Sequence, residues 1–209
     1  MRKILLLIVM LHSLTVFSQN NADIYILRKI NLGRDQRPDA ALNLISETAR
    51  PFSIAAPMVV FGIGWIGNNK TTRQKAVMMG ASFFVASAIT TTLKYSINRP
   101  RPYVDYPDID KISVGGSPSF PSGHTSDAFS NATSLSLAFP KWYVIVPSYA
   151  YASAVGYSRM HLGVHYPSDV IAGAVVGAGS AYLCYRAQKW ISRKKRSKRE
   201  MDRLLSQPR

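Results

Sequence analysis

The sequence predicts an all-α fold, a polytopic bundle of transmembrane helices, and three observations lead to that prediction. Hydrophobic residues make up 47% of the 209 residues and charged residues only 18%, which is less charge than an average soluble domain carries. The C-terminal segment is strongly basic, as is typical of the cytoplasmic end of a membrane protein. Five apolar runs contain no charged residue, at 51–69, 76–93, 128–140, 142–158 and 170–185.

A soluble helical bundle is the alternative to this fold. Soluble helices usually carry a charged face, whereas none of the five runs has one. A bilayer core about 30 Å thick needs about 17–25 apolar residues per helix, and the longer runs reach that length. The shorter runs reach it when their flanking polar residues are included. We therefore expect about five membrane helices after removal of a signal peptide, or six if the first segment is retained.

Residues 1–18 have the pattern of a signal peptide. Arg2 and Lys3 give a basic start, and an apolar stretch and a cleavage point follow. An uncleaved first membrane helix is the other interpretation, and both place the next residues outside the cytoplasm. Residues 19–50 are polar and are expected to form an extracytoplasmic N-terminal segment. Within it, residues 39–50 are expected to form a short amphipathic helix on the membrane surface.

The expected membrane helices follow in order, at residues 51–69, 74–95, 122–140, 142–158 and 168–187. From an outside start, the chain reaches the cytoplasm after the first, third and fifth helices. The segments found there are net basic, as the positive-inside rule requires. Residues 51–187 are then the membrane-embedded domain and residues 188–209 a basic cytoplasmic tail, in a bacterial cytoplasmic (inner) membrane. The basic residues of this tail also suggest nucleic-acid binding. Attraction of the tail to anionic lipid is the simpler account, so no nucleic-acid partner is expected.

Three short clusters of polar residues stand at the ends of these helices. On the expected topology all three lie at the extracytoplasmic face, although they come from four helices and two connecting loops. We therefore expect them to form one site. Its candidate residues are Lys94, Arg101, Ser122, Gly123, His124, Arg159, His165 and Asp169.

The cations of these clusters are typical of a phosphate-binding site. A phosphoryl group in transfer carries negative charge on its equatorial oxygens, and a guanidinium group can bind two of them at once. Lys94, Arg101 and Arg159 are therefore expected to hold the phosphate. Arg99 lies nearby, but its spacing makes it a weaker candidate for this role. Contact with lipid headgroups is the alternative role for such cations. Cations on the outer face run against the positive-inside trend, which favours a functional role.

The remaining residues of the clusters suggest phosphoryl transfer through a histidine. Ser122 and Gly123 begin a helix whose free backbone N–H groups form an anion site. The Asp169 carboxylate would fix the tautomer of His165, whose other ring nitrogen would attack phosphorus. His124 would protonate the leaving oxygen and then activate water. This scheme requires no metal and no other cofactor, because the cations neutralise the charge.

These residues resemble the three-part signature of the type 2 phosphatidic acid phosphatases. That superfamily also includes vanadium haloperoxidases and bacterial acid phosphatases. The resemblance covers about residues 51–187, and every signature position matches. The three parts are Lys94-x6-Arg101-Pro102, then Pro121-Ser122-Gly123-His124, then Ser158-Arg159-x5-His165-x3-Asp169.

The resemblance implies a metal-independent phosphatase with a phosphohistidine intermediate. By motif position, His165 is the nucleophile, Asp169 orients it and His124 is the general acid, while the other five candidate residues hold the phosphate. Membrane members of the family act on lipids, and the implied substrates are undecaprenyl pyrophosphate, phosphatidylglycerol phosphate, phosphatidic acid or lipid A phosphates. Two alternatives stay open: a lipid phosphotransferase that uses the same histidine, and a non-catalytic lipid-binding membrane protein. The expected partners are the lipid phosphate and the bilayer.

Three other patterns are rejected. Residues 62–67 fit the dinucleotide-binding pattern G-x-G-x-x-G, but they lie in an apolar run with no acidic residue about 20 positions later, and close helix packing explains them better. His161, His165 and Asp169 recur every four residues like metal ligands, but glycine and proline interrupt a helix there. Ser122 lacks the G-x-S-x-G setting of a serine hydrolase.

Overall fold

The computed structural model describes residues 19–112 and 115–205. Within these ranges every regular element is a helix, which confirms the expected all-α class. The expectation of a signal peptide or first membrane helix concerns residues 1–18, which lie outside the described ranges. The helices are α2 (Gln19–Asn31), α3 (Asp39–Glu47), α4 (Ala49–Ile66), α5 (Lys70–Ile97), α6 (Pro102–Asp105), α7 (Gly123–Ala138), α8 (Trp142–His161) and α9 (Pro167–Leu205).

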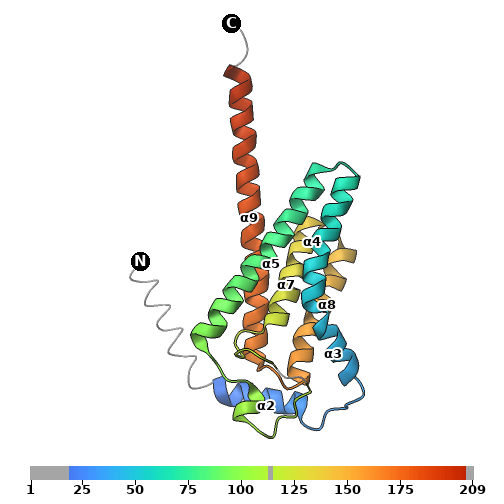
Figure 1. The fold of residues 1–209 in the computed structure, drawn as a ribbon, viewed down its shortest axis with the longest axis vertical. Coiled ribbons are helices and arrows are strands. Elements are labelled where there is room, and N and C mark those ends of the chain that lie inside the picture. The colour runs from blue at the N-terminus through green and yellow to red at the C-terminus, as the bar shows by residue number, and fades with distance from the viewer. Residues whose placement is uncertain (1–18, 113–114, 206–209) are drawn as a thin grey trace, which may run out of the picture.

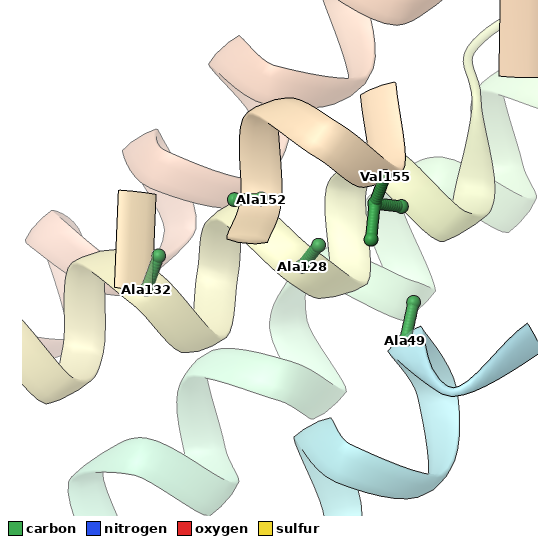
Figure 2. Packing of buried hydrophobic residues seen from close by; sticks show 5 residues of the cluster. All are labelled: Ala49, Ala128, Ala132, Ala152 and Val155. Carbon is green, nitrogen blue, oxygen red and sulfur yellow. The ribbon is translucent and has the colours of Figure 1, made fainter. Parts of the chain in front are cut away.

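Helix α7 lies at the centre of the bundle, with α4, α5, α8 and α9 packed against it (Figure 1). Most of its buried residues are Ala, Ser or Thr. Such small side chains let neighbouring helices approach closely. One core cluster lies between α4, α7 and α8 and is formed largely by alanine (Figure 2): Ala49, Ala128, Ala132, Ala152 and Val155.

The contact between α7 and α9 depends on two glycines spaced four residues apart. A Cβ atom on Gly173 would lie 2.5 Å from the carbonyl oxygen of Ser122, and one on Gly177 would lie 2.2 Å from that of Ser126. Real Cβ atoms do not come this close, so only glycine fits at both positions. The spacing is the small-x-x-x-small pattern of tightly packed membrane helices. It brings the first turns of α7 and α9 together.

The glycines of residues 62–67 do not share one role. A Cβ atom on Gly64 would lie 2.8 Å from the backbone nitrogen of Arg73, so this glycine allows the α4–α5 turn to close. Gly62, in contrast, has nothing within 4 Å of its Cβ position. Close helix packing therefore explains Gly64 but not Gly62.

Within the described residues, three helical segments are long and apolar enough to cross a membrane: Ala49–Ile66, Lys70–Asp105 and Pro167–Lys195. Large apolar side chains on α4 and α5 point outward, and Met58 and Phe84 are 68% and 72% exposed. Two of the expected membrane helices fall short of this standard. Helix α7 has only 16 residues and is rich in Ser and Thr, and α8 includes several Tyr and Ser residues. The expected total of five membrane helices therefore stays a prediction.

Helices α2 and α3 lie across the end of the bundle at which α7 and α9 begin (Figure 1). Ile24 and Leu27 of α2 pack with Ile109 and Tyr166. At the end of α2, the side chain of Asn31 donates hydrogen bonds of 2.9 Å to the carbonyl oxygens of Asp110 and His161. Helix α3 forms within the segment expected to be an amphipathic helix, and it packs against α8.

Helix α9 is the longest element, with 39 residues. It begins at Pro167, one residue before the expected start at residue 168, and Asp169 lies in its first turn. It continues well beyond residue 187, where the last membrane helix was expected to end, and projects from the end of the bundle opposite to α2 (Figure 1). Lys and Arg are good helix formers, so the basic segment extends the helix instead of ending it.

Candidate active site

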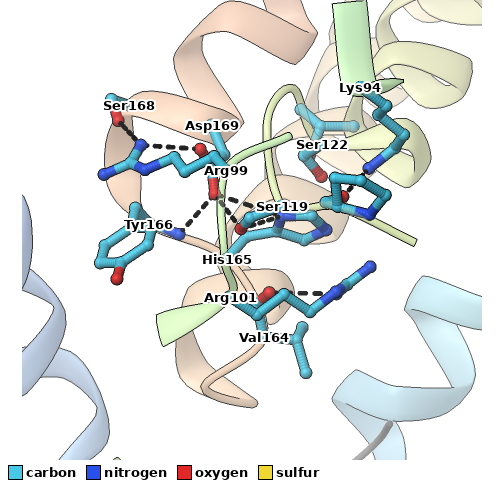
Figure 3. Close-up of polar contacts among 12 residues, drawn as sticks. Lys94, Arg99, Arg101, Ser119, Ser122, Val164, His165, Tyr166, Ser168 and Asp169 are labelled. Carbon is cyan, nitrogen blue, oxygen red and sulfur yellow. Dashed lines mark hydrogen bonds and ion pairs between the residues drawn. The ribbon is translucent and has the colours of Figure 1, made fainter. Parts of the chain in front are cut away.

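The three sequence clusters meet at the end of the bundle that α2 and α3 cover. The end of α5, the start of α7, the end of α8 and the start of α9 all reach this place, and residues 115–120 pass between them (Figures 1 and 3). The connection from α8 to α9 turns at Gly163, whose φ angle of +71° belongs to the left-handed region that favours glycine. This turn places His165 beside the first turn of α9.

His165 and Asp169 form the buried centre of the site (Figure 3). The Nδ1 atom of His165 lies 3.4 Å from Oδ2 of Asp169. The same carboxylate oxygen accepts hydrogen bonds from the backbone N–H of Tyr166, at 3.0 Å, and from the hydroxyl of Ser119, at 2.5 Å. Because Nδ1 faces Asp169, Nε2 is the ring nitrogen left to react.

The surroundings of His165 keep its ring neutral. Burial lowers the pKa of His165 to about 4, because a protonated imidazole would lose its hydration there, and this outweighs the opposite effect of Asp169. The charges of Arg101 and Arg159 act in the same direction as burial. His165 is therefore unprotonated at neutral pH, the state in which a ring nitrogen can be a nucleophile.

Arg99 contacts the carboxylate and not an anion site. Its Nη1 donates to Oδ1 of Asp169, at 2.9 Å, and to the hydroxyl of Ser168, at 2.7 Å. Its Nη2 donates to Asp23 of α2, at 3.0 Å, and its guanidinium carbon lies 3.8 Å from the centroid of the Tyr166 ring. Arg99 thus has different contacts from its neighbour Arg101: it holds the Asp169 carboxylate, whereas Arg101 donates to backbone carbonyl oxygens.

Lys94 and Arg101 are held by backbone oxygens of one loop. The ammonium group of Lys94 donates to the carbonyl oxygen of Pro118, at 2.5 Å, and Nε of Arg101 donates to that of Ser117, at 2.9 Å. Nη1 of Arg101 also donates to the carbonyl oxygen of Val164, at 3.1 Å. Neutral carbonyl groups orient these buried cations without neutralising their charge, so both remain able to bind an anion.

Arg159 reaches the site from the end of α8. Its side chain is buried, and Nη1 donates to the hydroxyl of Ser46 on α3, at 2.5 Å. The carboxylate of Glu47 lies 3.9 Å away. Among the described residues, Nε of Arg159 has no hydrogen-bond partner although it is buried. A buried donor of this kind is ready to bind an incoming anion.

The Pro-Ser-Gly-His segment begins α7, with Ser122 as the N-cap residue. The backbone N–H of Ser122 donates to the carbonyl oxygen of Asp169, at 2.9 Å, and the hydroxyl of Ser122 accepts a bond from Thr125. The absent side chain of Gly123 leaves space beside Lys94, whose Cε would be 3.8 Å from a Cβ atom there. His124 stands at the rim, 3.9 Å from Glu47 and 31% exposed.

The structure thus brings all eight candidate residues to one end of the bundle, and it adds others that the sequence did not indicate. Ser119 contacts both members of the His–Asp pair, Ser46 anchors Arg159, and Asp23 anchors Arg99. Serine and aspartate are common residues, and none of the three lies in a recognisable pattern. Their contribution is visible only once α2, α3 and the loop are placed.

The metal alternative for His161, His165 and Asp169 finds no support in the geometry. Nε2 of His161 lies 2.6 Å from a carboxylate oxygen of Asp39, on the α3 side, whereas His165 faces Asp169. The two histidines therefore point to different partners. Within residues 19–112 and 115–205, no group of three His, Cys, Asp or Glu side chains has a geometry suited to a metal ion.

Comparison with known proteins identifies the family. The model of the PAP2 superfamily matches residues 75–193, which is more than half of the chain. A lipid A 1-phosphatase of Rhizobium etli is 32% identical over 173 residues, which cover 73% of each chain. An undecaprenyl-diphosphatase of Sulfolobus acidocaldarius is 33% identical over 115 residues, which cover 54% of this chain and 55% of that protein. The chain belongs to the PAP2 superfamily.

A solved structure has the same fold. The transmembrane PAP2 type phosphatidylglycerolphosphate phosphatase from Bacillus subtilis matches with a TM-score of 0.71 and 25% identity, over 90% of this chain and 96% of that one. Together with the three apolar helices, this likeness makes the chain a multi-pass membrane protein of the helical-bundle type. The matches to the first curated relatives take in 55–59% of their length.

Proposed function

We propose that this chain is a membrane lipid phosphatase, which removes phosphate from a phosphomonoester or diphosphate of a lipid through a phosphohistidine on His165. One observation carries the proposal: three cations from two of the motifs, Lys94, Arg101 and Arg159, lie close to the buried pair of neutral His165 and the Asp169 carboxylate. Figure 3 shows Lys94 and Arg101 beside this pair. Relatives that are phosphatases of lipid A and of undecaprenyl diphosphate support the same reaction class.

In the proposed first step, Lys94, Arg101 and Arg159 hold the phosphoryl oxygens, and Nε2 of His165 attacks phosphorus. The bond from phosphorus to the leaving oxygen breaks, and His124 gives that oxygen a proton. Asp169 stabilises the positive charge that develops on the imidazole. In the second step, His124 takes a proton from water, the resulting hydroxide attacks the phosphohistidine, and inorganic phosphate leaves. His165 regains its neutral form, and no metal takes part.

An apolar groove beside the site supports a lipid as the substrate. It has a volume of about 570 Å³ and lies between α4, α7 and α8, with Phe52, Leu135 and Tyr151 among its lining residues. One of its lining residues is Thr48, which follows Glu47 at the rim of the site. A hydrocarbon chain in this groove would bring its phosphate towards His124 and Arg159.

The proposed topology places the site at the extracytoplasmic side of a bacterial inner membrane and the basic end of α9 in the cytoplasm. Two observations support this arrangement. The site and the basic end of α9 lie at opposite ends of the molecule (Figure 1). The short loop between α4 and α5 is followed by Lys70, Arg73 and Lys75, which fits the cytoplasmic side.

The test is phosphate release by the detergent-purified protein from a panel of lipids: undecaprenyl pyrophosphate, phosphatidylglycerol phosphate, phosphatidic acid and lipid A. EDTA is present throughout, and His165→Ala is the control variant. We expect release from at least one lipid in the wild type and a loss of at least about 10³-fold in the variant. Unchanged release by a folded His165→Ala protein would refute the mechanism, and loss of release with EDTA would refute metal independence.

A further inference from the structure

Arg50 lies at the site although it belongs to none of the three motifs. It is the second residue of α4, just after the corner between α3 and α4. One of its terminal nitrogens, Nη2, lies 4.0 Å from the point that a Cβ atom on Gly123 would occupy, and Cε of Lys94 lies 3.8 Å from the same point. Two cationic side chains therefore approach the open space beside Gly123.

The Arg50 side chain is fixed along one edge and open along the other. Its Nε donates to Oδ2 of Asp127, at 3.1 Å. Asp127 is only 2% exposed and also receives the hydroxyl of Ser87, at 3.4 Å, whereas the Arg50 side chain is 63% exposed. A buried carboxylate thus holds the guanidinium group at the rim. A guanidinium group has five N–H donors, so the terminal nitrogens of Arg50 can still bind an anion.

The motif residues already provide for one phosphoryl group. Lys94, Arg101 and Arg159 are buried, whereas the side chain of Arg50 is largely exposed at the rim of the site. A cation in this position is suited to bind a second anionic group of the same substrate. In a lipid diphosphate, that group is the phosphate between the attacked phosphorus and the lipid chain.

We propose that Arg50 binds this second phosphate, which makes lipid diphosphates the preferred substrate class. The inference rests on the proposed function. When Nε2 of His165 attacks the terminal phosphorus, the bond from that phosphorus to the bridging oxygen breaks, and a lipid monophosphate leaves with the oxygen and its electron pair. Arg50 stabilises the negative charge that gathers on this leaving phosphate. A lipid monophosphate substrate has no such group, so Arg50 does little for it.

The obvious variant needs care, because removal of Arg50 alone leaves the Asp127 carboxylate buried and unpaired. The double variant Arg50→Gln/Asp127→Asn removes both charges and keeps a pair of side chains that can hydrogen-bond. Arg73→Gln is the matched control. Arg73 lies near the start of α5, at the end of that helix away from Lys94, so this variant removes one arginine far from the site. Thermal unfolding of each protein in the same detergent shows whether it is folded.

The experiment compares diacylglycerol pyrophosphate with phosphatidic acid of the same acyl chains, so that the substrates differ by one phosphate. We expect the double variant to lose about 10- to 100-fold in kcat/KM on the diphosphate, the size that loss of a charge-assisted hydrogen bond gives. On the monophosphate it should stay within about threefold of the wild type. Equal losses on both substrates, or no loss on either, would overturn the proposal.

A binding measurement decides the question independently of turnover. Methylenediphosphonate has a carbon bridge that cannot be hydrolysed. We expect it to raise the Tm of the wild-type protein more than inorganic phosphate does, and to raise the Tm of the double variant no more than phosphate does. Equal effects of the two anions on the wild type would overturn the Arg50 proposal. Failure of turnover in the wild type, with the expected binding pattern, would instead refute the phosphatase function alone.

Discussion

At the scale of single residues, the Asp169 carboxylate shows how the site is held. Its Oδ1 accepts from Arg99, and its Oδ2 faces His165, Ser119 and the backbone of Tyr166. Arg99 is in turn fixed by Asp23 of α2. The orientation of the proposed nucleophile therefore depends on a helix that lies outside the motif region.

Two arginines that are neighbours in sequence should differ in their kinetic effects. Arg99→Gln should lower kcat about 10- to 100-fold with little change in KM, because Arg99 is hydrogen-bonded to Asp169 and is not one of the residues proposed to hold the phosphate. Arg101→Gln should lower kcat/KM more strongly, because it removes a cation from the phosphate site. Steady-state kinetics on one lipid substrate separates the two. A large rise in KM for Arg99→Gln would mean that Arg99 binds substrate directly.

The lowered pKa of His165 links stability to pH. The imidazole has a pKa of about 6.5 in an unfolded chain, whereas burial lowers it to about 4 in the folded protein. Between these values the unfolded chain binds a proton that the folded protein does not bind, so the contribution of His165 to stability is lost as pH falls through this window. We expect the wild type to lose more Tm between pH 7 and pH 5 than His165→Gln does. Identical losses would contradict the lowered pKa.

At the scale of helices, the site depends on the close contact between α7 and α9. Gly173 and Gly177 allow this contact, and a backbone hydrogen bond of 2.9 Å from Ser122 to the carbonyl oxygen of Asp169 joins the starts of the two helices. A change in helix spacing would therefore move the phosphate-binding segment away from the His165–Asp169 pair.

Gly177→Leu should destabilise the protein by several kcal/mol, because the new side chain meets the backbone of Ser126 and Ser130. Gly179→Leu is the matched control on the same helix, since nothing lies within 4 Å of its Cβ position. Thermal unfolding in detergent measures both, and phosphate release should fall with Gly177→Leu alone. Similar stability of the two variants would mean that α7 and α9 can separate at little cost.

The start and end of several helices could be predicted from sequence. The glycine and the proline expected to interrupt a helix after His161 are local signals, and the structure has a turn at Gly163 and the start of α9 at Pro167. The length of α9 was not predicted, because loss of hydrophobicity marks the end of a membrane span and not the end of a helix. The interior position of α7 was also missed, since an uncharged run does not distinguish a helix that faces lipid from one that faces protein.

The residues of the candidate site likewise fall into those that the sequence predicts and those that it does not. The eight motif residues could be found because their types and spacings form a pattern, and the helix ends that carry them do meet. The positions of Ser46, Ser119 and Arg50 at the site could not be found, because they depend on the packing of α3, α4 and the 115–120 loop. Their contacts join residues far apart in sequence, and no periodicity encodes such contacts.

At the scale of the whole molecule, the proposed orientation can be measured by labelling. In a Cys184→Ser background, Lys111→Cys should react with a membrane-impermeant maleimide in intact cells, because the loop that contains residue 111 lies at the site end. Lys70→Cys, at the opposite end, should react only after the membrane is permeabilised. Both side chains are exposed, which makes the two positions comparable. The reverse pattern would invert the topology.

The length of helix α9 also fixes the distance between the site and the basic end of the molecule. At 1.5 Å per residue, Asp169 and Arg186 are separated by about 26 Å along one unbroken helix, close to the thickness of a bilayer core of about 30 Å. On the proposed topology, the basic end is anchored at one surface, so the Asp169 carboxylate that orients His165 is kept at the boundary of the other. The two products would then separate without crossing the membrane: phosphate dissolves in the water, and the lipid stays in its leaflet.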